Sequence, residues 1–328
     1  MIDNNINFSF KTTNELELIE IEELNRSFNS IFRNSSLNKR SLKEFHNKFS
    51  NNFLGYSFHG IMKKENNIIG SYSVIPREFN FFSEKKIFGL AVDTGIDPNH
   101  RGNLMNLHKL ALGVYDLLKK NNINFVYGHT NNNIYLVRKK LMQWKDISNF
   151  NFYVHPVNLK NLLGFFSFLN IFILLLVKIV FLLKPTSNKI ISLFNIYKIN
   201  NENFIKSRYD TSHIFESDRN SKFVYKIIEK DIGKNKKIKT AYIIDTNTND
   251  AESINDIIKK ISSKEKDISL IIYVTSLNLR FKNMFKIPSF LMKENTLISG
   301  KRLSDKDLSN ELYESFNWSL NFSDFDLY

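Results

Sequence analysis

The sequence contains no cysteine, and only 5 prolines and 11 glycines among its 328 residues. The absence of cysteine excludes disulfides, thiolate zinc sites and thiol nucleophiles, and it is typical of a reducing compartment. The scarcity of proline and the lack of serine-rich tracts argue against long disordered linkers, while a hydrophobic content of 42% can fill a core. At this length we expect two folded domains.

Several common catalytic and cofactor-binding motifs are also missing. The sequence has no P-loop, no Rossmann Gly-x-Gly-x-x-Gly and no Gly-x-Ser-x-Gly elbow, and its 7 histidines lack metal-ligand spacing, so we expect no metal. Residues 1–5 show neither the basic nor the apolar region of a signal peptide, which favours a cytoplasmic location.

Acidic residues are outnumbered, 33 against 46 lysines and arginines, which gives a formal net charge of +13. The lysines are spread along the whole chain and no nucleic-acid-binding module accompanies them, so we do not expect DNA or RNA as a partner. An acidic small molecule or an anionic membrane surface fits this charge better.

One segment, residues 147–201, has no acidic residue at all. Within it, residues 161–177 form an uncharged run of 17 residues, at the lower limit of about 17–25 for a membrane span. Two interpretations remain open: an apolar helix packed between the domains, or a monotopic membrane anchor over residues 162–183. The second would place the protein peripherally on the inner face of a membrane. The lysines of the segment are Lys160, Lys178, Lys184, Lys189 and Lys198.

Hydrophobic periodicity predicts an α/β half on each side of this segment. In the first half we expect helices over 16–32, 41–49 and 104–119, a helix ending near Met142, and strands over 56–62, 68–75, 86–96 and 123–127. In the second half we expect strands over 223–228, 239–245 and 268–275 and a helix over 251–264. The predicted division is a first domain over 1–150, a connecting segment over 151–201 and a second domain over 202–328.

The most informative feature is the segment 92–105, which leads from a strand through a basic turn into a helix. The strand ends at Asp97-Pro98, Arg101-Gly102 lie in the turn, and the helical pattern starts near Leu104. Such a turn places free backbone N–H groups and the positive end of a helix dipole around one point, which suits a pyrophosphate. The second half has no glycine-bearing turn of this kind, so we expect no second phosphate site.

Residues 93–102, Asp-Thr-Gly-Ile-Asp-Pro-Asn-His-Arg-Gly, resemble the pyrophosphate-binding motif of the GNAT superfamily of CoA-dependent N-acyltransferases, and more closely that of the branch found in surface-polysaccharide biosynthesis. Residues 127–131 and 140–145 are similar to the next strand end and helix end of that branch. Residues 219–224 and 318–326 resemble its second, GNAT-like half more weakly. The resemblance implies an α/β (α+β) fold with a GNAT-type mixed, mostly antiparallel sheet flanked by helices, in two tandem halves.

The resemblance also implies acetyl-CoA or another acyl-CoA as a substrate bound at this turn, with the main chain of strand 86–96 along its pantetheine arm. The superfamily's turn usually reads Arg-Gly-x-Gly-x-Gly/Ala, whereas Leu104 and Asn106 occupy the second and third small positions here. If Leu104 is the first helical residue, its N–H can still point at the anion. The implied cofactor-binding residues are Val92, Thr94, Ile96, Asn99, His100, Arg101, Gly102, Asn103, Leu104, Met105 and Asn132.

Acyl transfer to an amine requires a free amine, a polarised thioester carbonyl and a proton for the leaving thiolate. The resemblance places Asp93 and His129 at strand ends beside the thioester, where either could accept the ammonium proton. A turn-stabilising carboxylate and a loop histidine are their alternative roles. The tyrosine that many family members use as acid corresponds to Lys139, so Tyr135, one turn earlier, is the expected substitute or else an aromatic residue packed under the cofactor.

We therefore expect an N-acyltransferase, in the first instance an N-acetyltransferase, whose acceptor is an amine such as a nucleotide- or lipid-linked amino sugar in polysaccharide biosynthesis. Two alternatives remain open. One is a non-catalytic GNAT-fold binding module, for which Leu104 and Asn106 are the best evidence. The other is an aminoacyl-tRNA-dependent transferase that would use the basic surface.

Overall fold

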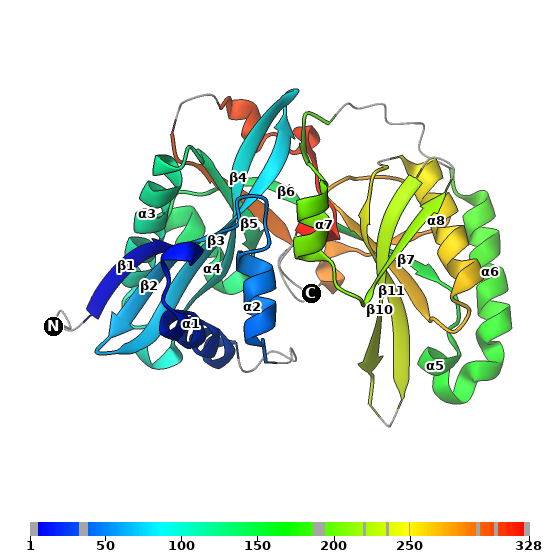
Figure 1. Cartoon of the computed structure of the whole chain (residues 1–328). Helices are drawn as coiled ribbons and strands as arrows, with labels where there is room; N and C mark the ends of the chain where they lie inside the picture. The colour runs from blue at the N-terminus through cyan, green and yellow to red at the C-terminus, as the bar shows by residue number, and fades with distance from the viewer. Residues whose placement is uncertain are drawn as a thin grey trace. The chain divides into compact units, whose positions relative to one another are not determined.

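The computed structural model describes residues 6–32, 39–185, 194–218, 221–233, 236–248, 250–292, 296–304 and 308–324 (Figure 1). Residues 1–5, 219–220 and 325–326, which belong to segments interpreted above, lie outside the described residues. The chain divides into two compact units, each drawn from three stretches of sequence. Unit 1 comprises Met1–Ser148, Asn195–Arg208 and Leu297–Glu314, and unit 2 comprises Asn149–Phe194, Tyr209–Thr296 and Ser315–Tyr328.

The two units are not consecutive in sequence, unlike the expected domains 1–150 and 202–328. Strand β14 (Leu297–Arg302) lies antiparallel to β5 (Phe125–Thr130), so a segment from the last part of the chain extends the sheet of unit 1. The expected connecting segment is divided as well, because its residues up to Phe194 belong to unit 2 and the rest belong to unit 1. The pairing of β14 with β5 joins residues that are far apart in sequence, so no local sequence pattern predicts it.

Unit 1 is built on a mixed sheet in the order β1-β2-β3-β4-β5-β14-β6, with the short strand β8 beside β3. The pairs from β1 to β4 are antiparallel. Strands β4 and β5 run parallel and pair at only two positions, Gly89 with Val126 and Leu90 with Tyr127. The strands are β1 Ile6–Thr12, β2 Phe58–Lys64, β3 Asn67–Phe81, β4 Glu84–Ile96, β6 Lys145–Asn149 and β8 Ile196–Lys198.

Helices cover both faces of this sheet. Alternation along β2 turns Phe58 and Met62 towards α3 and turns His59 towards α2, where it lies against the ring of Phe49. Helix α3 buries the stripe that its spacing predicted, namely Leu107, Leu110, Ala111, Val114 and Leu118. The helices are α1 Leu18–Ile31, α2 Leu42–Phe49, α3 Leu104–Lys120, α4 Asn132–Leu136 and α7 Glu202–Arg208, and a single π-helical turn, Val137–Leu141, follows α4.

Unit 2 contains a second mixed sheet in the order β13-β7-β12-β11-β10-β9. Strands β11 (Lys237–Thr246) and β12 (Leu270–Thr275) run parallel and are joined by α8 (Ala251–Lys264), whose isoleucines at 254, 257, 258 and 261 are buried. These two sheets flanked by helices confirm the predicted α/β (α+β) class. The other strands of this sheet are β7 Asn151–Pro156, β9 His213–Asp218, β10 Ser221–Asp231 and β13 Phe285–Lys286, and the two-residue strand β15, Trp318–Ser319, lies outside it.

After β7 the chain of unit 2 forms α5 (Lys160–Leu163), a 3₁₀ stretch over Gly164–Leu169, and α6 (Asn170–Leu183). Judged by length and composition alone, the 24-residue segment Lys160–Leu183 is one helical segment that could cross a membrane. Most of this segment is exposed.

Candidate functional site

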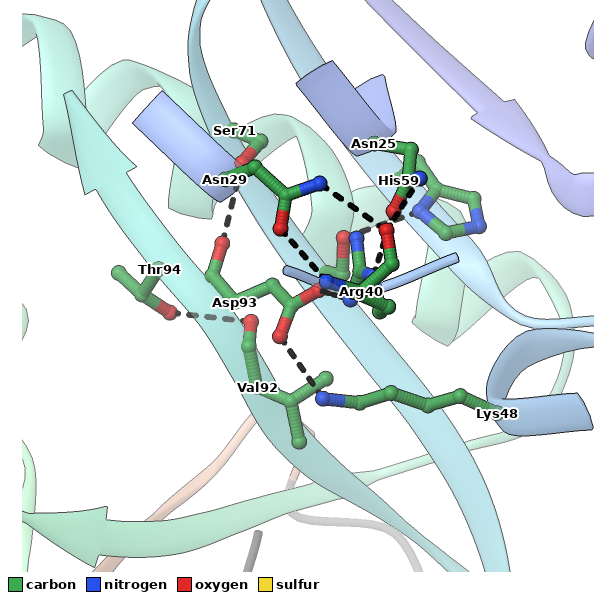
Figure 2. A network of polar contacts seen from close by, with 10 residues as sticks. Asn25, Asn29, Arg40, Lys48, His59, Ser71, Val92, Asp93 and Thr94 are labelled. Atoms are coloured by element: carbon green, nitrogen blue, oxygen red, sulfur yellow. Dashed lines mark hydrogen bonds and ion pairs between the residues drawn. The ribbon is translucent and has the colours of Figure 1, made fainter. Parts of the chain in front are cut away.

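Strand β4 carries a β-bulge at the predicted strand end. Ser71 of β3 pairs with Gly95 and Ser73 pairs with Val92, so β4 has one extra residue between these pairs. At the bulge Asp93 adopts a left-handed conformation with φ of 45°, which aspartate tolerates better than most residues. The hydroxyl of Ser71 donates to the carbonyl of Asp93 at 3.1 Å (Figure 2).

The carboxylate of Asp93 is buried and lies between two cations (Figure 2). It forms an ion pair with Arg40 and accepts a hydrogen bond from Lys48 Nζ at 2.8 Å. Burial alone would raise the pKa of Asp93, but the charges of Lys48 and Arg40 outweigh it and hold the pKa below its usual range. Both carboxylate oxygens of Asp93 are thus paired with cations at the bulge.

Two asparagines of α1 hold Arg40 in place. Arg40 Nε donates to Asn25 Oδ1 and its backbone N–H donates to Asn29 Oδ1, each at 2.8 Å. Both asparagine side chains donate in return to the carbonyl of Arg40. The sequence did not indicate Arg40 or Lys48 as part of the site, because they precede Asp93 by 53 and 45 residues and form no motif with it.

His59 lies next to this cluster and is fully buried. Its Nε2 is 2.9 Å from Thr13 Oγ1 and its Nδ1 is 2.9 Å from Ser73 Oγ. Burial lowers the pKa of His59 to about 3, although the charge of Asp93 acts in the opposite direction. His59 is therefore neutral at physiological pH and forms part of the polar support of the bulge.

The turn between β4 and α3 has the predicted strand–turn–helix form. Asp97 Oδ1 accepts a hydrogen bond from the N–H of Asn99, and Asn103 Oδ1 caps α3 by accepting one from the N–H of Met105, each at 2.9 Å. Leu104 is the first residue of α3, and within the described chain no hydrogen-bond partner meets its N–H or that of Gly102. These two donors are available to an anion at the positive end of α3.

Arg101 brings positive charge to this turn, and His100 lies beside it. Arg101 Nε donates to the carbonyl of Ile96 at 2.8 Å, and in the described residues its two terminal nitrogens have no partner. His100 Nδ1 is 3.6 Å from Asp97 Oδ1. Val92 and Ile96 are buried, so only their main chain is placed to meet a ligand, and Thr94 donates its hydroxyl to the carbonyl of Val92 at 3.3 Å.

A buried arginine lies where β4 and β5 cease to pair. The π-helical turn carries Arg138, whose Nη1 donates to the carbonyl of His129 at 2.6 Å and to Thr130 Oγ1 at 3.4 Å. The guanidinium lies over the ring of Trp144 at 4.3 Å, burial lowers its pKa, and its Nε has no partner in the described part of the chain. Sequence reasoning missed Arg138, whose only signal is one arginine beside two lysines in a short helical run.

The two positions that the resemblance indicated for a catalytic acid are in direct contact. Lys139 Nζ donates to the hydroxyl oxygen of Tyr135 at 2.7 Å and to Asp146 Oδ2 at 2.6 Å, and the Tyr135 hydroxyl donates to Asp146 Oδ2 at 3.4 Å. The hydrogen bonds with Asp146 and Tyr135 raise the pKa of Lys139. Asn131 caps α4, and Asn132 is its first helical residue.

No protein-family model and no curated protein matches this sequence. Solved structures match its fold. A GCN5-related N-acetyltransferase from Anabaena variabilis covers 90% of this chain and 73% of its own, with a TM-score of 0.57 and 10% identity. The fold is that of the GCN5-related N-acetyltransferases. A probable N-acyltransferase from Enterococcus faecalis (90% and 73%, TM-score 0.55, 11% identity) and a GCN5-related N-acetyltransferase from Kribbella flavida (91% and 72%, TM-score 0.55, 8% identity) share this GNAT fold.

Within the GNAT fold of this chain, the residues singled out in the sequence meet at one end of the sheet of unit 1. Asp93 and His129 lie on the neighbouring strands β4 and β5, beyond Leu90 and Tyr127, the last residues at which these two strands pair. The turn over residues 97–103 leaves the same end of β4. Arg40 and Lys48 already occupy the carboxylate of Asp93.

Proposed function

We propose that unit 1 is an acyl-CoA-dependent N-acyltransferase. One observation carries the proposal: the parallel strands β4 and β5 pair at only two positions, beside a helix N-terminus with two available N–H groups and a free guanidinium end. The pyrophosphate would bind Gly102, Leu104 and Arg101, and the pantetheine arm would follow the main chain of β4 beyond Leu90. The GNAT fold supports this arrangement.

The reaction replaces the thioester by an amide. The amine nitrogen forms a bond to the carbonyl carbon, the carbon–sulfur bond breaks, His129 accepts a proton from the nitrogen, and Tyr135 provides a proton to the thiolate. Lys139 and Asp146 orient the Tyr135 hydroxyl. Arg138 holds the carbonyl of His129 and thereby the end of β5. We propose acetyl-CoA as donor, a nucleotide- or lipid-linked amino sugar as acceptor, and the cytoplasm as location.

Calorimetric titration with acetyl-CoA tests the binding step. Arg101→Glu should weaken binding about 100-fold, roughly 2.7 kcal/mol, because it places an anion beside the pyrophosphate. Lys222→Glu makes the same charge change next to the corresponding strand–helix connection of unit 2 and should leave the affinity unchanged. Equal loss in both variants would contradict a site in unit 1.

Release of CoA tests the chemical step, and a thiol reagent can follow it directly because the chain itself has no cysteine. With an amino sugar as acceptor, His129→Gln and Tyr135→Phe should each lower kcat by about 100-fold or more while acetyl-CoA still binds. Lys140→Gln, at an exposed residue of the π-helical turn that follows α4, is the matched control. Unchanged kcat in the first two variants would remove their assigned roles.

A non-catalytic GNAT-fold module is the second candidate, and the turn itself favours it. Leu104 stands where the superfamily has a small residue, with a side chain 58% exposed, and Asn103 already occupies the N–H of Met105. If this module is the correct description, millimolar acetyl-CoA will produce neither heat nor a shift of the thermal unfolding midpoint.

A further inference from the structure

The outward face of α6 is apolar, which is unusual for a helix on a protein surface. Amphipathic surface helices turn charged and polar residues outward. Here the outward residues are large hydrophobic side chains, together with the phenylalanines of the preceding 3₁₀ stretch. Phe165 is 88% exposed and Leu183 is 80% exposed, and between them Phe168, Ile171, Phe172 and Leu175 are exposed as well. We call these six residues the apolar face.

Helix α6 is nevertheless attached to unit 2 at both ends. At its start, Asn170 Oδ1 accepts a hydrogen bond from the N–H of Leu159 at 2.7 Å. At its end, Phe181 stacks on His155 of β7, with ring centroids 5.7 Å apart, and packs on Phe285 of β13 at 4.7 Å. Lys184 Nζ then donates to the carbonyl of Met284 at 2.9 Å. These contacts hold one stripe of the helix against the protein and leave the opposite side outward (Figure 1).

The geometry of the segment argues against a straight membrane crossing. Gly164 has φ of 57° and ends α5, so the 24 residues do not form one continuous α-helix. The 14 residues of α6 span about 21 Å at about 1.5 Å per residue, short of the roughly 30 Å hydrocarbon core. A crossing would also break the contacts of Phe181 and Lys184. The contacts at both ends of α6 therefore favour a helix that lies along the surface of a membrane.

Charge around the apolar face favours anionic lipid over a second copy of the chain. Lys178 is exposed on the flank of α6, between the side attached to unit 2 and the apolar face, and no ion pair with an acidic residue occurs for it within the described residues. The ammonium of Lys236 lies against Gly164, next to the exposed phenylalanines. No acidic residue occurs in 147–201. A second copy would bring further lysines to this face, whereas anionic headgroups would neutralise them.

We propose that the apolar face docks unit 2 on an anionic membrane surface, with its side chains in the acyl region and Lys178 and Lys236 at the headgroups. The docking surface shares no residue with the acyl-CoA site of unit 1, so this proposal holds or fails independently of the proposed function. Of the two interpretations that the sequence left open for residues 162–183, the proposal selects the monotopic membrane anchor over the helix packed between the domains.

Vesicle flotation of the full chain tests the docking. The protein should float with phosphatidylcholine vesicles that contain phosphatidylglycerol and much less with phosphatidylcholine alone. Phe165→Ser/Phe168→Ser/Phe172→Ser should lower vesicle binding more than roughly tenfold, and Lys178→Glu should lower it about tenfold for the anionic vesicles. Leu18→Ser/Ile19→Ser/Phe316→Ser removes equally exposed apolar residues elsewhere and should bind as the parent protein does.

Three results would overturn the proposal. The parent protein could fail to float with either vesicle. It could form a dimer in light scattering that the triple phenylalanine variant converts to a monomer, which would make the face an interface between copies. It could resist extraction with alkaline carbonate, which would show a membrane-spanning segment. Circular dichroism and thermal unfolding establish that each variant is folded, so loss of binding is not loss of structure.

Discussion

Both units contain a strand–helix–strand arrangement. They differ in the residues at the N-terminus of the helix and at the ends of the two strands. In unit 1, β4, α3 and β5 form a parallel pair with a bulge in β4. In unit 2, β11, α8 and β12 form a parallel pair, and the register with β10 shifts between Val224 and Tyr225, which places a bulge in β11. The comparison is therefore between two copies of one local architecture within the same chain.

The strand–helix connections differ in charge. In unit 1 Arg101 and His100 lie at the N-terminus of α3, with the N–H of Leu104 available. In unit 2 Asp250 caps α8, because its carboxylate accepts a hydrogen bond from the N–H of Ser253 at 2.8 Å and another from the hydroxyl of Thr248 at 2.6 Å. The carboxylate of Asp250 already interacts with the positive end of α8, and its negative charge would repel a phosphate at this position.

The strand ends differ as well. In unit 2 the side chain of Asn321 donates to Asp245 Oδ1 at 3.0 Å and to the carbonyl of Thr246 at 3.3 Å, and its oxygen accepts from the hydroxyl of Tyr273 at 3.3 Å. A C-terminal segment thus closes the ends of β11 and β12. In unit 1 the end of β5 is contacted by Arg138, which donates to the carbonyl of His129 at 2.6 Å. The polar contacts of Asn321 occupy the strand ends in unit 2, which is consistent with the acyl-CoA site that we propose in unit 1.

The largest effect should come from the bulge of unit 1. Asp93→Ala leaves Arg40 and Lys48 buried without their counter-ion, so the free energy of unfolding of unit 1 should fall by about 3–5 kcal/mol. Urea unfolding measures it, and each unit has its own buried tryptophan as fluorescent probe, Trp144 in unit 1 and Trp318 in unit 2.

The matched control for this prediction is Asp116→Ala, which breaks the exposed ion pair of Asp116 with Lys119. An exposed pair contributes at most about 1 kcal/mol, so little change is expected. A loss below about 1 kcal/mol in Asp93→Ala would show that the charged cluster does not stabilise the bulge, and the contrast with unit 2 would disappear.

A smaller effect should follow from removing the hydrogen bonds of Asn321 at the strand ends of unit 2. Asn321→Ala leaves the buried groups of Asp245 and Tyr273 with fewer partners, so the unfolding free energy of unit 2 should fall by about 1–3 kcal/mol. Trp318 fluorescence in urea reports it. Asn278→Ala, at an exposed asparagine, should be close to neutral. A change of acetyl-CoA affinity in Asn321→Ala would place ligand binding in unit 2 after all.

The smallest effect, taken per pH unit, should be the change in the unfolding free energy of unit 1 with pH. The pKa of His59 is about 3 in the fold, below the value near 6.5 of an unfolded histidine, so the unfolded state binds a proton first as the pH falls. Its contribution to stability is complete above about pH 6.5 and declines towards pH 3, by about 1 kcal/mol per pH unit.

Urea unfolding between about pH 7 and pH 4.5 measures this slope, and His59→Gln should flatten it. Below this window Glu20 adds its own loss, because Lys11 and Lys63 outweigh the effect of burial and hold its pKa at about 2. A parent protein whose unit 1 shows no slope above pH 4.5 would exclude a buried neutral histidine at this position.

Local pattern predicted much of the fold. Periodic apolar residues predicted α3 and α8 almost to the residue, and alternation predicted β2, β4 and the first half of β3, because burial on one face repeats with the period of the element. The expected strand over 68–75 ended too early, since β3 continues to Phe81. The turn over residues 97–103 was also predicted from a local pattern, because its proline, its glycine and the start of the helix are adjacent in sequence. Asp93 was predicted at the site, but not its ion pairs with residues of distant helices.

The sequence by itself determined the strand–turn–helix of residues 92–105 and the apolar, acid-free character of residues 147–201, since both depend on neighbouring residues. Only the tertiary structure decided that β14 pairs with β5, that Arg40 and Lys48 neutralise Asp93, and that Asn321 closes unit 2. It also decided which side of α6 is outward. Each of these depends on burial and pairing between distant segments, and free energy of that kind arises only when the chain is folded.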